Sequence, residues 1–199
     1  MPQKLVDITA NKRRRIIKPR LAVLHTTQGV NLPGVQDLKN LRGWFDPSQS
    51  RVSAHYGVDK AGNSIRMVPD DYVAFHVGLA NDYSLGIEQV ANAAISKREW
   101  VNDHHLGLYR VAAILVDWNE KFDIPLRHSR LKGVCQHKHV SGPWGHSDCG
   151  DGFPEEYVIH WAKLIKARRH HWRDRVHEFE QDVARVQRRW GKKVDTRPW

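Results

Sequence analysis

Short apolar runs separated by polar turns predict several β-strands in the first two thirds of the chain. One run ends at His25-Thr26-Thr27, which is typical of a buried strand followed by a polar loop. Two others flank Lys60-Ala61-Gly62-Asn63, which predicts a β-hairpin because glycine and asparagine adopt positive φ readily. The strand candidates are residues 20–24, 52–58, 64–68, 84–90 and 132–136.

Apolar residues at helical spacing predict three helices between or after these strands. They cover residues 31–45, 106–118 and 155–165, and the last has acidic residues in its first turn. Strands interleaved with helices indicate the α/β class, here a single domain with a central mixed β-sheet flanked by helices.

The pattern changes towards the C-terminus. From Trp172 to Trp190 the apolar positions follow steps of 4, 3, 4, 3 and 4, which is a heptad seam. Residues 166–199 hold 11 Lys or Arg against 5 Asp or Glu, so we expect a long basic C-terminal helix. It either folds back as an ordinary amphipathic helix, pairs with another chain, or binds an anionic cell-envelope polymer.

Three segments follow from these patterns. Residues 1–19 are read as a basic N-terminal arm with little structure of its own, residues 20–168 as the α/β domain, and residues 169–199 as the basic amphipathic helix and tail.

Composition and charge narrow the class of protein. With 40% hydrophobic and 27% charged residues in 199, the chain fits a soluble globular protein. No apolar run is long enough for a transmembrane segment, and no apolar stretch follows the basic N-terminus as in a signal peptide. The two cysteines cannot form a disulfide framework. The net charge of +10 predicts an anionic partner, whether nucleic acid, membrane or cell-wall polymer.

Groups that bind metals or move protons occur in three places. His25 and Glu88 each lie towards the end of a predicted strand, and residues 135–150 combine three histidines, two cysteines and an aspartate in a Gly- and Pro-containing loop. His25, His137 and Asp148 would form a zinc site with one open position for water. Glu88 would then take the proton of that water, and His146 would donate a hydrogen bond to the developing oxyanion.

Two other interpretations use the same residues. The histidines of the loop can be solvated while His25 is a hydrogen-bonded core residue. Alternatively, Cys135, His137, His146 and Cys149 form a closed zinc site without catalysis, which the basic charge would suit as a nucleic-acid-binding module. The cysteine and histidine spacing matches no familiar finger pattern, and this interpretation leaves Glu88 and His25 without a role.

Five short motifs, in order, resemble the type-2 N-acetylmuramoyl-L-alanine amidase family over about residues 18–168. This family includes phage endolysins, muropeptide amidases and peptidoglycan recognition proteins, and the resemblance to endolysins is the strongest. The motifs are Leu24-His25-Thr26-Thr27, Val52-Ser53-Ala54-His55-Tyr56, Ala74-Phe75-His76-Val77-Gly78, Ser84-Leu85-Gly86-Ile87-Glu88 and His146-Ser147-Asp148-Cys149-Gly150.

The resemblance implies zinc ligands at His25, His137 and Asp148, with Glu88 as acid–base group and His146 as oxyanion stabiliser. Ala54 stands where other members of the family carry a tyrosine. The chain also departs from the family pattern at Cys149, where a proline is usual, and around His137, so Cys149 and His139 are rival ligands.

The resemblance further implies a substrate and a setting. We expect a zinc-dependent hydrolase that cleaves the amide between N-acetylmuramic acid and L-alanine in bacterial peptidoglycan, with His55, His76 and Trp144 as substrate-binding residues. A phage endolysin made in the host cytoplasm without a signal peptide fits best, and specific nucleic-acid binding is not expected. A non-catalytic peptidoglycan-binding protein of the same fold is the main alternative.

Overall fold

The computed structural model describes residues 11–29, 35–46, 50–140 and 145–190, with side chains beyond Trp172 given only for Gln181. Its strands are β1 (Lys12–Arg14), β2 (Leu21–Thr26), β3 (Tyr56–Val58), β4 (Ser64–Arg66), β5 (Tyr72–Ala74), β6 (Ser84–Gln89) and β7 (Gly133–Gln136). Its helices are α1 (Gln36–Phe45), α2 (Lys97–Asp103), α3 (His105–Phe122) and α4 (Glu155–Trp190), with short 3₁₀ turns η2 (Gly78–Tyr83) and η3 (His137–His139).

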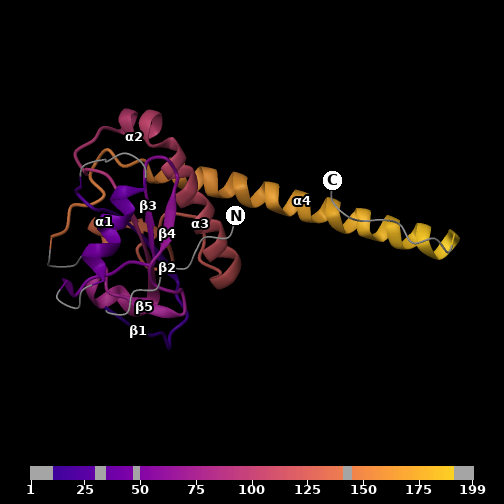
Figure 1. Cartoon of the computed structure of the whole chain (residues 1–199), viewed down its shortest axis with the longest axis horizontal. Helices are drawn as coiled ribbons and strands as arrows, with labels where there is room; N and C mark the ends of the chain where they lie inside the picture. The colour runs from indigo at the N-terminus through magenta and orange to yellow at the C-terminus, as the bar shows by residue number, and fades with distance from the viewer. Residues whose placement is uncertain (1–10, 30–34, 47–49, 141–144, 191–199) are drawn as a thin grey trace. The chain divides into compact units, whose positions relative to one another are not determined.

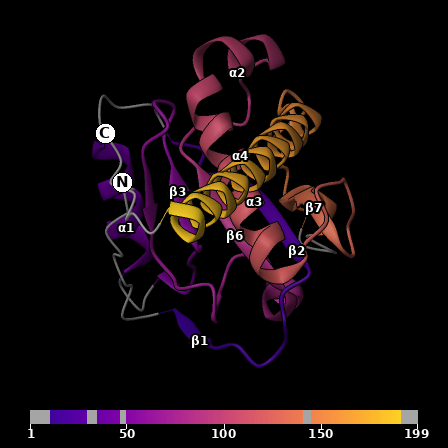
Figure 2. The same cartoon turned by 90° about the vertical axis from the view of Figure 1, so that its right-hand side faces the viewer.

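The main sheet has the strand order β4-β3-β6-β2-β7, and Figure 2 shows β6, β2 and β7 side by side. Strands β3, β6, β2 and β7 are mutually parallel, whereas β4 pairs with β3 in an antiparallel hairpin. This confirms the predicted mixed sheet and the predicted hairpin. Parallel strands share one carboxyl edge, and that edge is where open α/β sheets bind their ligands.

Helices α1 and α3 lie on opposite sides of this sheet, as Figure 1 shows. All six residues of β2 are buried, as expected for a parallel strand covered on both faces. Residues of α1 form one apolar cluster with Met67 and Val68, and Leu21 and Val23 of β2 form another with Val77, Ala80 and Cys135.

Part of the expected N-terminal arm is a strand in the structure. β1 pairs antiparallel with β5 in a second, two-stranded sheet, and neither strand has a hydrophobic pattern that predicts it. Arg15 follows β1, and its guanidinium donates hydrogen bonds to four backbone carbonyls, those of Asp70, Tyr72, Asp82 and Ser84. Burial outweighs the neighbouring carboxylates and lowers the pKa of Arg15 to about 10.

The chain consists of two compact units, Met1–Lys163 and Leu164–Trp199. The seam positions Val176, Phe179, Val183, Val186 and Trp190 lie outside the described side chains, so the role of the basic C-terminal segment stays a prediction. Within the described residues, no helix combines the length and apolar character that crossing a bilayer requires.

Candidate metal centre and active site

The sheet register brings the predicted residues to one edge. His25 pairs with Glu88 across β2 and β6, and Leu24 pairs with Gln136 across β2 and β7. His137 directly follows Gln136 and therefore lies next to His25. The side chain of His25 is only 3% exposed, because β2 is an interior strand that lies between β6 and β7.

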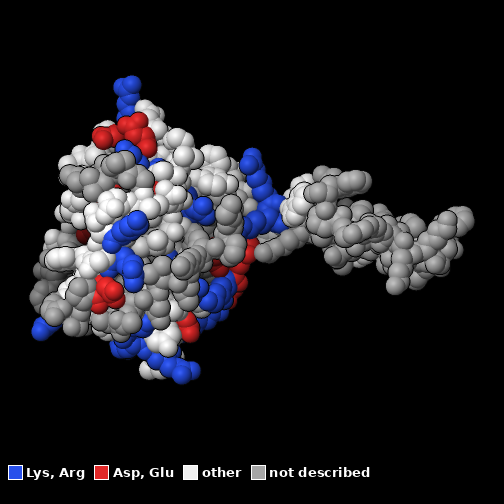
Figure 3. Space-filling model, in the orientation of Figure 1, with Lys and Arg blue, Asp and Glu red and all other residues white. Residues whose placement is uncertain are grey.

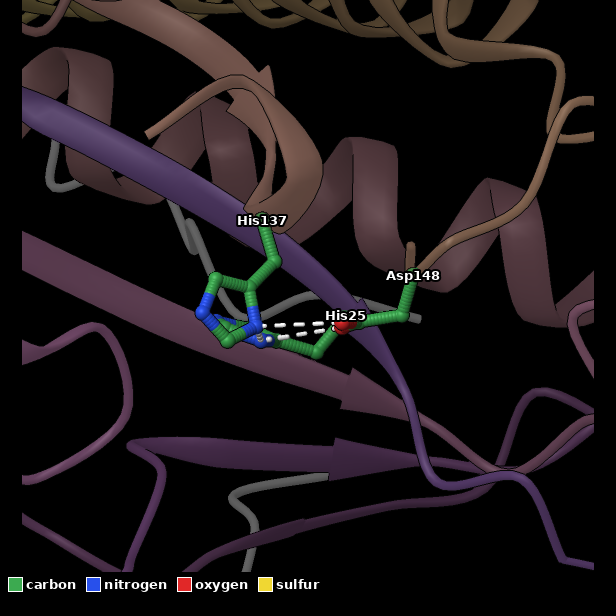
Figure 4. A group of neighbouring side chains, drawn as sticks. All are labelled: His25, His137 and Asp148. Carbon is green, nitrogen blue, oxygen red and sulfur yellow. Dashed lines mark hydrogen bonds and ion pairs between the residues drawn. The ribbon is translucent and has the colours of Figure 1, made fainter. Parts of the chain in front are cut away.

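Three potential ligand atoms meet at this edge, as Figure 4 shows. The Nδ1 atoms of His25 and His137 are 3.1 Å apart. One oxygen of Asp148 lies 3.3 Å from His25 Nδ1, and the other lies 3.1 Å from His137 Nδ1. Donors at about 2.0–2.1 Å from a tetrahedral ion stand roughly 3.3 Å from one another. The three side chains therefore fit a zinc-sized cation without rearrangement.

The charge state of these groups also suits a cation. Burial raises the pKa of Asp148, but hydrogen bonds from His137 and His25 outweigh it and hold that pKa well below its usual range. Burial lowers the pKa of His25 despite the nearby Asp148. Asp148 is consequently ionised and His25 neutral at physiological pH, which are the forms that bind metal.

The loop that carries Asp148 is fixed by backbone contacts. The amide of Lys138 donates to the carbonyl of Asp148 at 2.9 Å. Gly150 has a φ of +88°, and a Cβ added there would overlap the carbonyl oxygen of Ala93. The loop therefore needs glycine at this position in order to present Asp148 to the two histidines.

Glu88 is the proton-transfer candidate beside this group. Its Oε1 lies 4.0 Å from His25 Nδ1, and its Oε2 is buried without a hydrogen-bond partner among the described residues. Burial, reinforced by the charge of Asp148, raises the pKa of Glu88 to about 8. An unpartnered buried carboxyl with a pKa near neutrality is suited to exchange a proton with a bound molecule.

A cavity of about 700 Å³ opens over these residues. His146 lies on its wall, exposed and stacked on His137 with the ring centroids 4.1 Å apart. Trp44, which is 66% exposed, contributes an aromatic side chain to the lining from α1. The other lining residues include Thr27, Gln28, Arg51, Phe75 and Asn81.

The three residues predicted to bind substrate differ in their relation to the cavity. His76 is on the cavity wall but almost wholly buried, while His55 is fully buried and absent from the described lining. His55 Nδ1 accepts from the amide of Gly86, and its Nε2 lies 3.1 Å from the carbonyl of Tyr72, so both ring nitrogens have partners inside the protein. Trp144 lies outside the described residues.

Neither of the two rival ligands, His139 and Cys149, belongs to the group formed by His25, His137 and Asp148. His139 belongs to a second group with His128 and Glu155, in which His128 Nδ1 lies 2.6 Å from Glu155 Oε1. The side-chain Nε2 of Gln136 donates to the other oxygen of Glu155 at 3.2 Å. This group therefore ties β7 to the start of α4 through hydrogen bonds. Cys149 is fully buried, and burial raises the pKa of its thiol well above the usual value.

Sequence patterns do not reveal all the residues that build this site and support the strands beside it. Nothing in Lys12-Arg13-Arg14-Arg15 distinguishes Arg15, the arginine whose guanidinium reaches four backbone carbonyls. Asn81 accepts hydrogen bonds from the amides of His76 and Val77, and its only sequence signal is its position shortly after His76.

A family model described as N-acetylmuramoyl-L-alanine amidase matches residues 15–172. No curated protein matches the chain significantly.

Several solved structures share the fold. A selenomethionine derivative of AmpD is 18% identical, covers 81% of this chain and 96% of its own, and superposes with a TM-score of 0.62. The Staphylococcus aureus hydrolase AmiA in complex with its ligand is 16% identical, covers 84% of this chain and 87% of its own, and superposes with a TM-score of 0.60. The endolysin amidase LysCS from Clostridium intestinale is 20% identical, covers 81% of this chain and 95% of its own, and superposes with a TM-score of 0.55.

Proposed function

The chain belongs to the N-acetylmuramoyl-L-alanine amidase family, and from that premise we propose that it is a zinc-dependent peptidoglycan hydrolase that acts as a phage endolysin. The bond cleaved is the amide between the lactyl group of N-acetylmuramic acid and the L-alanine of the stem peptide. The observation that carries zinc dependence is the spacing of 3.1–3.3 Å among donor atoms of His25, His137 and Asp148.

These three residues would hold the ion, with Nδ1 of each histidine as the donor. When bound, zinc supplies Lewis-acid polarisation of the substrate carbonyl and lowers the pKa of water. The cavity beside the three ligands gives the amide access to this position.

Glu88 and His146 would handle the proton and the charge. Glu88 takes the proton of the attacking water with its unpartnered carboxylate and passes it to the leaving amine. The positive charge of a bound ion lowers the pKa of Glu88 from about 8, so that more of the carboxylate is ionised at neutral pH. His146, exposed on the cavity wall, donates a hydrogen bond to the oxyanion that develops on the carbonyl oxygen.

The test separates metal binding from chemistry. Glu88→Gln is expected to lower turnover on purified cell walls about 10²–10⁴-fold while zinc content stays at one equivalent. His25→Ala is expected to lose the zinc as well. Glu120→Gln, at an exposed position of α3, is the matched control. Mass spectrometry of the digested muropeptides should show stem peptides with a free L-alanine amine. Wild-type turnover in Glu88→Gln would remove the proton-transfer role.

The basic C-terminal segment forms a second, separate part of the proposal. It would bind an anionic cell-envelope polymer through the Lys and Arg residues after position 166. Figure 3 shows the described Lys and Arg side chains interspersed with acids on one face of the molecule, so this face offers no single basic patch. Deleting residues 169–199 should therefore weaken pull-down by cell walls at low salt. Unchanged and salt-insensitive pull-down would exclude an electrostatic tether.

A further inference from the structure

The ring of His25 has a second nitrogen, which faces away from the candidate metal centre. His25 Nε2 lies 3.0 Å from His76 Nδ1, and His76 Nε2 lies 3.2 Å from the hydroxyl of Ser84. All three side chains are buried, with His76 the most exposed at 9%. The site is thus backed by a continuous line of hydrogen-bonding groups inside the sheet.

The direction of these hydrogen bonds follows from the metal-binding form of His25. Its Nδ1 faces His137 and Asp148 and must be unprotonated to bind a cation. The proton of the neutral ring is therefore on Nε2, which donates to Nδ1 of His76. The proton of His76 is then on its own Nε2, which donates to Ser84.

The position of the His76 ring is fixed on several sides. A Cβ added at Gly86 would lie 2.6 Å from His76 Nδ1, so the imidazole rests directly on the backbone of β6. Asn81 Oδ1 accepts from the backbone amides of His76 and Val77 at 2.9 and 2.7 Å. These contacts explain why glycine stands two residues before Glu88: a larger residue there would displace the ring.

We propose that His76 is a positioning residue, which holds the His25 imidazole with Nδ1 directed at the metal, and that it does not bind substrate. Both ring nitrogens of His76 already have protein partners, so neither is free for a ligand in the cavity. Removal of such an outer partner of a metal ligand typically lowers metal affinity about 10–100-fold. The inference rests on the proposed zinc site.

The experiment measures zinc affinity directly, by competition with a chromogenic chelator. His76→Ala is expected to weaken zinc binding 10–100-fold, because His25 loses the acceptor that fixes its ring. His76→Asn places a side-chain oxygen near the position of Nδ1, and it should restore affinity to within a few-fold of wild type. Gly86→Ala should weaken binding in the same direction as His76→Ala, because it displaces the His76 ring.

Controls separate this role from loss of folding. His104→Ala removes another buried histidine, one that does not line the cavity, and should leave zinc affinity unchanged. The ¹⁵N shifts of the zinc-loaded wild type should show His76 protonated at Nε2 and unprotonated at Nδ1, the tautomer that accepts from His25 and that a purely structural role of His76 does not require. Circular dichroism checks that each metal-free variant is folded.

The possible failures are distinguishable. A wild type that does not bind zinc would overturn the proposed function. A wild type that binds zinc, together with a folded His76→Ala variant of equal affinity, would overturn only the positioning role. Equal weakening in His76→Ala and His76→Asn would also overturn it, because the oxygen acceptor would then have no effect.

Discussion

Glu88 should make the stability of the metal-free protein fall as the pH rises. Its pKa is raised from 4.5 to about 8 in the folded state, mainly by burial. The folded protein therefore holds this proton more tightly than the unfolded chain does, and folding is progressively disfavoured between pH 4.5 and pH 8. At 1.36 kcal/mol per pKa unit, the full effect is roughly 5 kcal/mol. The Glu88 side chain is only 12% exposed, so solvent screening reduces this figure little.

The substitution Glu88→Gln removes the titration while keeping the shape of the side chain. The free energy of unfolding is measured by urea denaturation of chelator-treated protein at pH 5 and pH 9. At pH 9 the free energy of unfolding of the variant should exceed that of wild type by several kcal/mol, whereas at pH 5 the two should differ little. Subtracting the difference at pH 5 from the difference at pH 9 gives a double difference, in which the titration of the histidines common to both proteins cancels. Zinc should shrink the difference, because a nearby cation favours the carboxylate. A double difference below about 1 kcal/mol would refute the burial argument.

Three further substitutions test how the site is supported. Arg15→Ala removes the guanidinium that donates to four backbone carbonyls, of which that of Tyr72 keeps His55 Nε2 as a partner, and at about 1–3 kcal/mol per unsatisfied group the melting temperature should fall sharply. Gly150→Ala forces a Cβ into the carbonyl of Ala93, so turnover on cell walls should drop; wild-type turnover would contradict this. Glu155→Gln should lower the free energy of unfolding by about 1–3 kcal/mol, since it weakens the charged hydrogen bond with His128, while leaving zinc content unchanged.

The elements with strong hydrophobic periodicity could be predicted from the sequence. The hairpin around Gly62 is predicted by its turn residues between two apolar runs, and the structure contains it. The core helix α3 (His105–Phe122) is predicted by the helical spacing of its apolar residues. Strands β1 and β5 are only three residues long and pair across about sixty residues. Their stability comes from that pairing and from the hydrogen bonds of partly buried Arg15, and neither leaves a periodic signal in the sequence.

In the candidate site, too, some features could be predicted from the sequence and others depend on tertiary contacts. His25 and Glu88 could be placed at strand ends, and parallel pairing then brings them together. The choice of His137 over His139 depended on the resemblance, because two histidines two residues apart look equivalent in the sequence. In the structure the turn η3 directs one ring at His25 and the other at Glu155. Burial of His55 and the packing of His76 on Gly86 are tertiary effects that residue types alone do not specify.

The division of the proposed metal ligands along the chain has a practical consequence. His25 and Glu88 precede the surface loop at residues 129–132, where Leu131 is 74% exposed, and His137 and Asp148 follow it. A chain cut in this loop would leave neither fragment with a complete coordination shell. The two pieces would meet along the edge between β2 and β7 and through packing such as that of Trp161 on Tyr109, but only together would they hold all the proposed ligands. Amidase activity regained by mixing the two pieces would therefore be expected to depend on the zinc concentration.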